Sequence, residues 1–149
     1  MREPTKKEKN LCEQIAKKYR KKIDIGDWLL RDKELGLVQD RKIDSVFNEW
    51  LIIHLIASEE VLESGCVRQD DSDIIPLWTI FDCLEFLRKK GYRCAGGSEN
   101  KDGTWWFSFT NTDKSIAGGF YYQGVGKTPL EACLKPVLAV VKENKNGKE

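Results

Sequence analysis

The chain has 149 residues, of which 40% are hydrophobic and 33% charged, and its formal net charge is +1. This length allows one good core or two small modules, and the composition is that of a globular protein rather than a disordered one. The longest apolar run, residues 50–57, is too short to cross a bilayer. The charged first ten residues lack the apolar core of a secretory signal. We therefore expect a cytoplasmic protein with no membrane partner.

The charge is unevenly distributed. Residues 1–22 carry nine Lys or Arg and three acidic residues, residues 23–75 carry five and thirteen, and residues 76–149 carry eleven and eight. The basic start could contact nucleic acid, a membrane surface or the acidic middle of the same chain. Because the whole chain is close to neutral, pairing within the chain is the favoured interpretation.

Five cysteines are present, an odd number with no CxxC pair. Metal sites need clustered thiolates or imidazoles, and the chain has a single histidine. We expect buried structural thiols, no metal and no cofactor.

The first half predicts one helix followed by a small antiparallel sheet. Thr5 and Glu8 form a capping-box pattern ahead of a helical apolar stripe. Strand-like runs follow at residues 28–30, 37–38 and 50–56. Ser58 is placed to cap a brief helix that ends near Gly65. The acidic segment 69–73 then indicates a linker, which gives an N-terminal module at residues 1–73 and a second domain at residues 74–149.

The second domain is predicted to be an α-β-β-β-α unit with a three-stranded antiparallel sheet, so the fold class is α+β. Thr79 and Asp82 can cap a helix that Gly91 ends, with an apolar arc of Ile80, Phe81, Cys83, Leu84, Phe86 and Leu87. A strand at residues 92–95 leads into a turn through Gly96, Gly97 and Gly103.

An aromatic hairpin follows, beginning with TWWFSFTN. Alternation places Trp105, Phe107 and Phe109 on one face and Trp106 on the other. A four-residue loop at 111–114 would set Trp106 opposite Gly119, with Tyr121 diagonal to it. This register leaves Trp106 and Tyr121 as an outward aromatic pair.

The segment GVGKTP suggests a phosphate-binding loop, but that motif needs glycine at the position held by Tyr121. A helix start explains the same residues: Thr128 is the N-cap, Pro129 the first helical residue, and Glu131 closes a capping box. His54 lies in an apolar run and has no recognisable catalytic partner. The sequence therefore predicts no catalytic residues and no enzyme.

The order of elements after Pro76, with WWFSFTN and GGFYYQGVGKTPLEACLKPVLAVV, resembles small phage and prophage proteins of the phage ABA-sandwich family. Those proteins join an aromatic hairpin to a helix that begins TPLEA or close to it. The resemblance covers roughly the last half of the chain. The resemblance implies a source, and with it the cytoplasm of a bacterial host cell, and a fold, without a defined activity.

The same order is similar to that of a double-stranded-RNA-binding domain, whose last helix begins with a lysine-rich turn that grips phosphates. Gly124, Gly126 and Lys127 match that approach, although Pro129, Leu130 and Glu131 stand where the basic cluster should be.

We expect a non-enzymatic binding module that acts on a host or phage protein, with Trp106 and Tyr121 as its anchors. The alternative is a structured-RNA-binding protein that uses Lys127, Lys101 and the basic first helix. The chain predicts no particular oligomeric state, and a nucleic-acid partner is the less favoured of the two.

Overall fold

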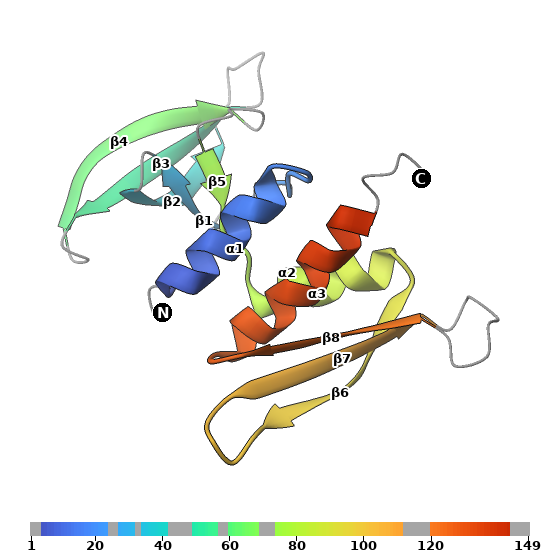
Figure 1. Cartoon of the computed structure of the whole chain (residues 1–149). Coiled ribbons are helices and arrows are strands. Elements are labelled where there is room, and N and C mark those ends of the chain that lie inside the picture. Colours follow the sequence, from blue (N-terminus) through green and yellow to red (C-terminus); the bar gives the residue numbers. More distant parts are fainter. Residues whose placement is uncertain are drawn as a thin grey trace. The chain divides into compact units, whose positions relative to one another are not determined.

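The structure is a computed structural model that describes residues 4–23, 27–31, 34–41, 49–56, 60–68, 74–111 and 120–143. Its elements in chain order are α1 (Lys6–Ala16), β1 (Trp28–Arg31), β2 (Glu34–Arg41), β3 (Glu49–Ile56), β4 (Glu60–Arg68), β5 (Ile74–Pro76), α2 (Ile80–Lys89), β6 (Tyr92–Glu99), β7 (Trp105–Asn111), β8 (Phe120–Gly126) and α3 (Pro129–Glu143) (Figure 1). The predicted α+β class is confirmed, including the C-terminal α-β-β-β-α unit and the β-rich N-terminal half with its leading helix.

The chain forms two compact units that differ from the predicted halves. One unit combines Met1–Lys18 with Trp78–Glu149, and the other is Tyr19–Leu77. Helix α1 packs on α3 and so belongs with the C-terminal elements, while β5 pairs with β1 and so belongs to the other unit. The predicted linker at 69–73 lies outside the described residues.

The Tyr19–Leu77 unit is a five-stranded antiparallel sheet in the order β4-β3-β2-β1-β5. Its described core is a cluster of Ile23, Leu29, Val38 and Ile74. The brief helix predicted from Ser58 to Gly65 is wrong, because residues 60–68 form β4 and pair with β3 along its length. Pairing with a neighbouring strand here overrides the local capping signal, since strand formation depends on cross-strand contacts.

In the other unit, α2 and α3 lie on one face of the sheet β6-β7-β8, and α1 packs against α3 (Figure 1). The local signals at the helix ends are confirmed. Thr5 with Glu8 and Thr79 with Asp82 both form complete capping boxes. Gly91, with φ 94°, follows α2 in the left-handed conformation.

Three details of this unit differ from expectation. Phe81 is 70% exposed on α2 instead of joining the apolar arc. Gly96 and Gly97 lie within β6, and the turn that follows runs through Gly103 at φ 89°. The largest fully buried side chain of the sheet is Phe109.

The hairpin register is shifted by six residues from the predicted one. Trp105 lies opposite Gly126 and Asn111 opposite Phe120, so the connection spans 112–119 rather than 111–114. The reason is packing against α3: a Cβ atom on Gly124 would lie 2.0 Å from the carbonyl oxygen of Ala132. Only a residue without a side chain allows β8 to come this close to α3. The strand therefore pairs in the register that directs Gly124 at the helix.

Candidate binding surface

The sheet β6-β7-β8 has one face away from its helices, which we call the outer face. Gly124 is directed at α3 and lies opposite Phe107, so Phe107 is on the helix side. Alternation along β7 then places Trp106, Ser108 and Thr110 on the outer face. Helix α1 packs on α3 and not on this face. The outer face is therefore left uncovered by the described elements of its own unit.

Trp106 is half-buried and held in a defined orientation on the outer face. Its indole Nε1 donates a hydrogen bond to Ser98 Oγ at 3.1 Å. A Cβ atom on Gly96 would lie 3.4 Å from Cη2 of the indole, so the ring lies across that glycine of β6. The indole therefore packs against β6 at van der Waals distance from this position.

A shallow hollow of about 420 Å³ lies beside the indole, lined by Asn100, Trp106, Gln123 and Val125. Val125 is 43% exposed and lies directly opposite Trp106 in the register. The Asn100 carboxamide donates to Thr104 Oγ1 at 2.9 Å. An indole, an isopropyl group and two carboxamides thus share one surface.

The turn next to the hollow is ordered by Asp102. Its carboxylate accepts hydrogen bonds from the amide and the hydroxyl of Thr104, at 3.0 and 2.7 Å. Both bonds lower the pKa of Asp102, and the bond from the Thr104 hydroxyl has the larger effect. The turn therefore holds Asn100 in place at the rim.

Tyr121, the second predicted anchor, is not adjacent to Trp106. It lies opposite Thr110, four residues along β8 from the position opposite Trp106. At the rise of a strand this is a separation of about 13 Å. The side chain of Tyr121 lies outside the described residues, as does that of His54. Val125 lies opposite Trp106, where the predicted register had Gly119, and a longer loop in the predicted hairpin would have placed it there.

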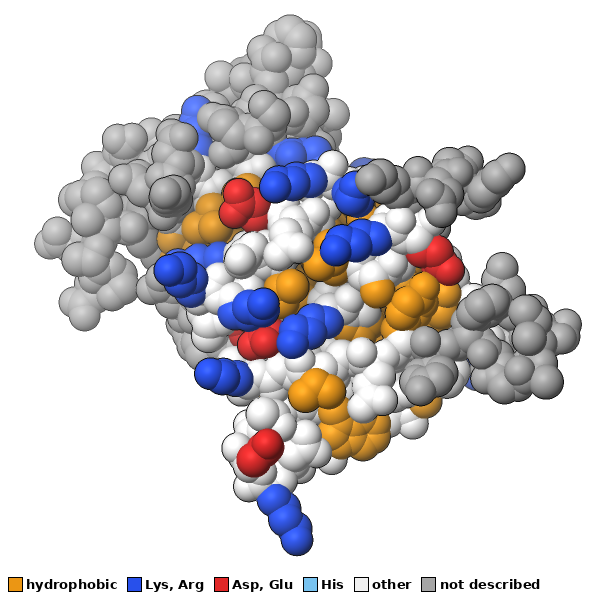
Figure 2. All heavy atoms as spheres, viewed as in Figure 1, with side chains coloured by type: hydrophobic (Ala, Val, Ile, Leu, Met, Phe, Trp, Pro, Cys, Tyr) orange, Lys and Arg blue, Asp and Glu red, His pale blue; other side chains and the backbone are white. Residues whose placement is uncertain are grey.

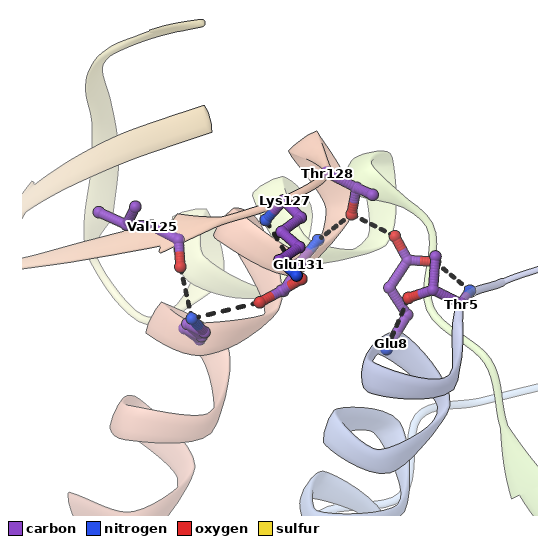
Figure 3. Close-up of polar contacts among 7 residues, drawn as sticks. Thr5, Glu8, Val125, Lys127, Thr128 and Glu131 are labelled. Atoms are coloured by element: carbon purple, nitrogen blue, oxygen red, sulfur yellow. Dashed lines mark hydrogen bonds and ion pairs between the residues drawn. The ribbon is translucent and has the colours of Figure 1, made fainter. Parts of the chain in front are cut away.

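Lys127, the third predicted site residue, has an exposed side chain at the start of α3 (Figure 3). Its backbone amide donates to Glu131 Oε1 at 3.3 Å. Thr128 is the N-cap as predicted, since its hydroxyl accepts from the amide of Glu131 at 3.0 Å. Glu131 completes the cap one residue earlier than expected, at Lys127 instead of Thr128.

The same end of α3 carries a second carboxylate. Glu8 is fully buried, and its Oε2 accepts a hydrogen bond from the Thr128 hydroxyl (Figure 3). Its Oε1 accepts from the amide of Thr5 at 2.8 Å. The positive ends of α1 and α3 therefore meet around one carboxylate, and two acidic side chains already occupy the N-terminus of α3.

Apart from Asp102, the described titratable groups with shifted pKa values lie on the helix side of the sheet. The Tyr92 and Tyr122 rings pack edge to face, with centroids 5.4 Å apart. Burial, and then the nearby Glu143 carboxylate, raise the pKa of both phenols. Burial, with a smaller effect of Cys94, raises the pKa of the Cys133 thiol to about 12. None of these groups borders the hollow.

Basic side chains are spread over the face of the protein that carries α1 and α3 (Figure 2). Lys135, on α3, is engaged with Glu131 at 3.3 Å and with the carbonyl of Val125. Among the residues that the structure describes, no cluster of His, Cys, Asp or Glu could hold a metal ion. A helix long and apolar enough to span a membrane is likewise absent from the described part of the chain.

Comparisons of the chain with protein-family models, with curated proteins and with solved structures gave no match.

Proposed function

We propose that the protein is a non-enzymatic binding protein whose outer sheet face receives a partner protein. The observation that carries this proposal is the position of Trp106, half-buried and fixed by Ser98, beside the exposed side chain of Val125. Tryptophan side chains that are already held in place are frequent anchors of protein interfaces, because little conformational entropy is lost when they bind.

The chemistry of the hollow supports binding rather than catalysis. An indole, an isopropyl group and two carboxamides neither gain nor lose a proton near neutral pH. General acid–base or nucleophilic catalysis would need a group that does. The carboxamides of Asn100 and Gln123 can instead orient a partner by hydrogen bonding while the apolar groups are covered.

An RNA-binding role is less well supported. In that role the N-terminus of α3 would meet phosphates, yet Glu8 and Glu131 place two carboxylates there. They accept the hydrogen bonds that a phosphate would need and repel its charge. The single positive charge of the exposed Lys127 side chain does not offset the negative charges of both carboxylates. The resemblance to small phage and prophage proteins favours a host or phage protein in the bacterial cytoplasm as the partner.

The proposal is tested by affinity capture from bacterial lysate with the full chain, Trp106→Ala and Phe81→Ala. The two variants each remove an exposed or half-exposed aromatic ring, from the outer face and from α2. Captured proteins are quantified by mass spectrometry after nuclease treatment.

We expect a protein that is captured by the unmodified chain and by Phe81→Ala and is depleted about tenfold with Trp106→Ala, the loss of one interface anchor. Equal capture by Trp106→Ala, with thermal unfolding unchanged, would refute the outer face as the binding surface.

A further inference from the structure

We propose that the partner binds as an extended segment added to the β6 edge of the sheet, with a large apolar side chain against Trp106. This inference rests on the proposed function and specifies its partner. It is carried by the backbone geometry of β6, by the small side chains along it and by the position of the indole.

β6 is an edge strand, since the sheet order is β6-β7-β8. The Asn100 amide donates to the Thr104 carbonyl at 2.7 Å, which continues the ladder past Glu99 and Trp105. Hydrogen-bonded pairs alternate in an antiparallel ladder, so Ser98 is in such a pair and its neighbours are not. The amides and carbonyls of Gly97 and Glu99 therefore point away from β7. Within the described residues, no hydrogen bond from outside the sheet reaches them.

The opposite edge of the sheet is partly engaged. By the same alternation the carbonyl of Val125 points outward from β8, and Lys135 Nζ donates to it. A lysine over an edge is one of the ways in which proteins prevent unwanted strand pairing. Edge β6 has no such cover from a described residue along Gly97 to Glu99.

The side chains of β6 leave room for an added strand. Ala95, Gly97, Ser98 and Glu99 are exposed, and Gly96 is half-buried. A contact within the sheet explains the glycine at position 97, because a Cβ atom there would lie 2.4 Å from Phe107 Cδ1. A Cβ atom on Gly96 would meet only the indole of Trp106, 3.4 Å from its Cη2, so packing within the sheet does not require glycine there. No proline or lysine interrupts this stretch.

The partner's chemistry follows from the outer face. An added strand would run about 4.8 Å from β6, and its alternate side chains would stand beside Gly96 and Ser98. The benzo ring of Trp106 lies over Gly96, so a large aliphatic or aromatic residue there would contact it. A second copy of β6 would bring Arg93, Gly96 and Ser98 to this face, and none of these is a large apolar residue. The partner strand must therefore have a different, more apolar sequence.

The test uses a displayed library of random ten-residue peptides selected on the full chain, and synthetic copies of the selected peptides as probes. Binding is compared between the unmodified protein, Glu99→Pro, Glu99→Ala and Trp106→Ala. Proline at 99 removes an outward amide and should leave the internal ladder intact, because this residue does not donate to β7. Glu99→Ala removes the same carboxylate and keeps the amide, so it is the matched control.

We expect peptides that alternate apolar residues, with affinity about tenfold weaker for Glu99→Pro and for Trp106→Ala and within about twofold for Glu99→Ala. Amide N-methylation at alternate peptide positions should weaken binding in the same way. Equal binding to Glu99→Pro, with the effect of Trp106→Ala retained, would overturn edge addition and leave the outer-face proposal standing. Insensitivity to both substitutions would overturn both. Failure to select any peptide, or a concentration-dependent dimer abolished by Glu99→Pro, would also overturn this inference.

Discussion

The hydroxyl of Thr128, the N-cap of α3, donates a hydrogen bond to the buried carboxylate of Glu8 in the first turn of α1. The two residues are 120 positions apart in the chain. Each belongs to the cap of its own helix, so one contact joins two helix starts that the sequence presents separately.

Replacing Glu8 should strongly destabilise the unit formed by Met1–Lys18 and Trp78–Glu149. Glu8→Ala removes the acceptor for Thr5 and Thr128, and we expect a loss of about 3 kcal/mol from the lost cap and the unpaired groups. Hydrogen exchange of the α1 and α3 amides measures this loss of stability. Glu13→Ala, at an exposed position of the same helix, is the control and should change stability by no more than about 0.5 kcal/mol. Similar effects of the two would contradict a structural role for the buried carboxylate.

Gly124→Ala should prevent α3 from packing on the sheet. The new Cβ would lie 2.0 Å from the Ala132 carbonyl oxygen and 2.6 Å from Pro136 Cδ, so backbone has to move. We expect a cost of about 3 kcal/mol or more, seen as a lowered Tm. Gly103→Ala is the matched comparison. Its φ of +89° costs about 1–2 kcal/mol of backbone strain, but nothing lies within 4 Å. A milder effect at 124 than at 103 would show that the observed packing is wrong.

The thiols should differ sharply in reactivity. Cys94 is exposed, whereas Cys12, Cys83 and Cys133 are buried. We expect iodoacetamide at pH 8.5 to modify Cys94 well before those three, as read by peptide mapping. Rapid labelling of Cys133 in the folded protein would contradict its burial.

Cys133 also makes a specific pH dependence. Its pKa rises from the ordinary 9.0 to about 12 in the folded chain, because burial disfavours the thiolate. The unfolded chain therefore loses this proton first, and the stability contributed by the neutral thiol is lost between pH 9 and 12 as pH rises. Unfolding curves should show a slope of at most about 1.4 kcal/mol per pH unit that is absent in Cys133→Ala. Identical slopes for the two proteins would exclude the shift.

The Tyr19–Leu77 unit should be removable. Its ends come together, since Arg20 donates to the Ile74 carbonyl at 2.9 Å. Joining Lys18 to Trp78 through a flexible linker of about eight residues should leave the other unit folded. Its NMR spectrum should retain protected amides in α1 and α3. A spectrum of an unfolded chain would show that the two units depend on each other for folding.

Binding to structured RNA should be absent. The carboxylates of Glu8 and Glu131 hold the end of α3 that would meet phosphates. A mobility-shift assay with duplex RNA at about 50 mM and 200 mM salt should show no complex at either. A complex at low salt that dissociates steeply at high salt would instead favour the RNA-binding alternative.

The helix starts were determined by the sequence alone. The capping boxes of Thr5 with Glu8 and of Thr79 with Asp82 formed as predicted, as did the N-cap at Thr128. Each involves residues three apart, so local geometry suffices to set them. The alternation that places Trp106 on the face opposite Phe107 was likewise set by the period of a strand.

Tertiary structure decided the hairpin register, the unit to which α1 belongs and the neighbour of Trp106. The register follows from the approach of Gly124 to α3, a contact that local pattern does not encode. Because of that shift, Val125 and not Tyr121 lies beside the indole of Trp106. The amides and carbonyls of Gly97 and Glu99 face away from β7, and no further strand of the sheet pairs with them because β6 lies at its edge. These features arise from contacts between residues distant in the chain, which periodicity and capping signals cannot specify.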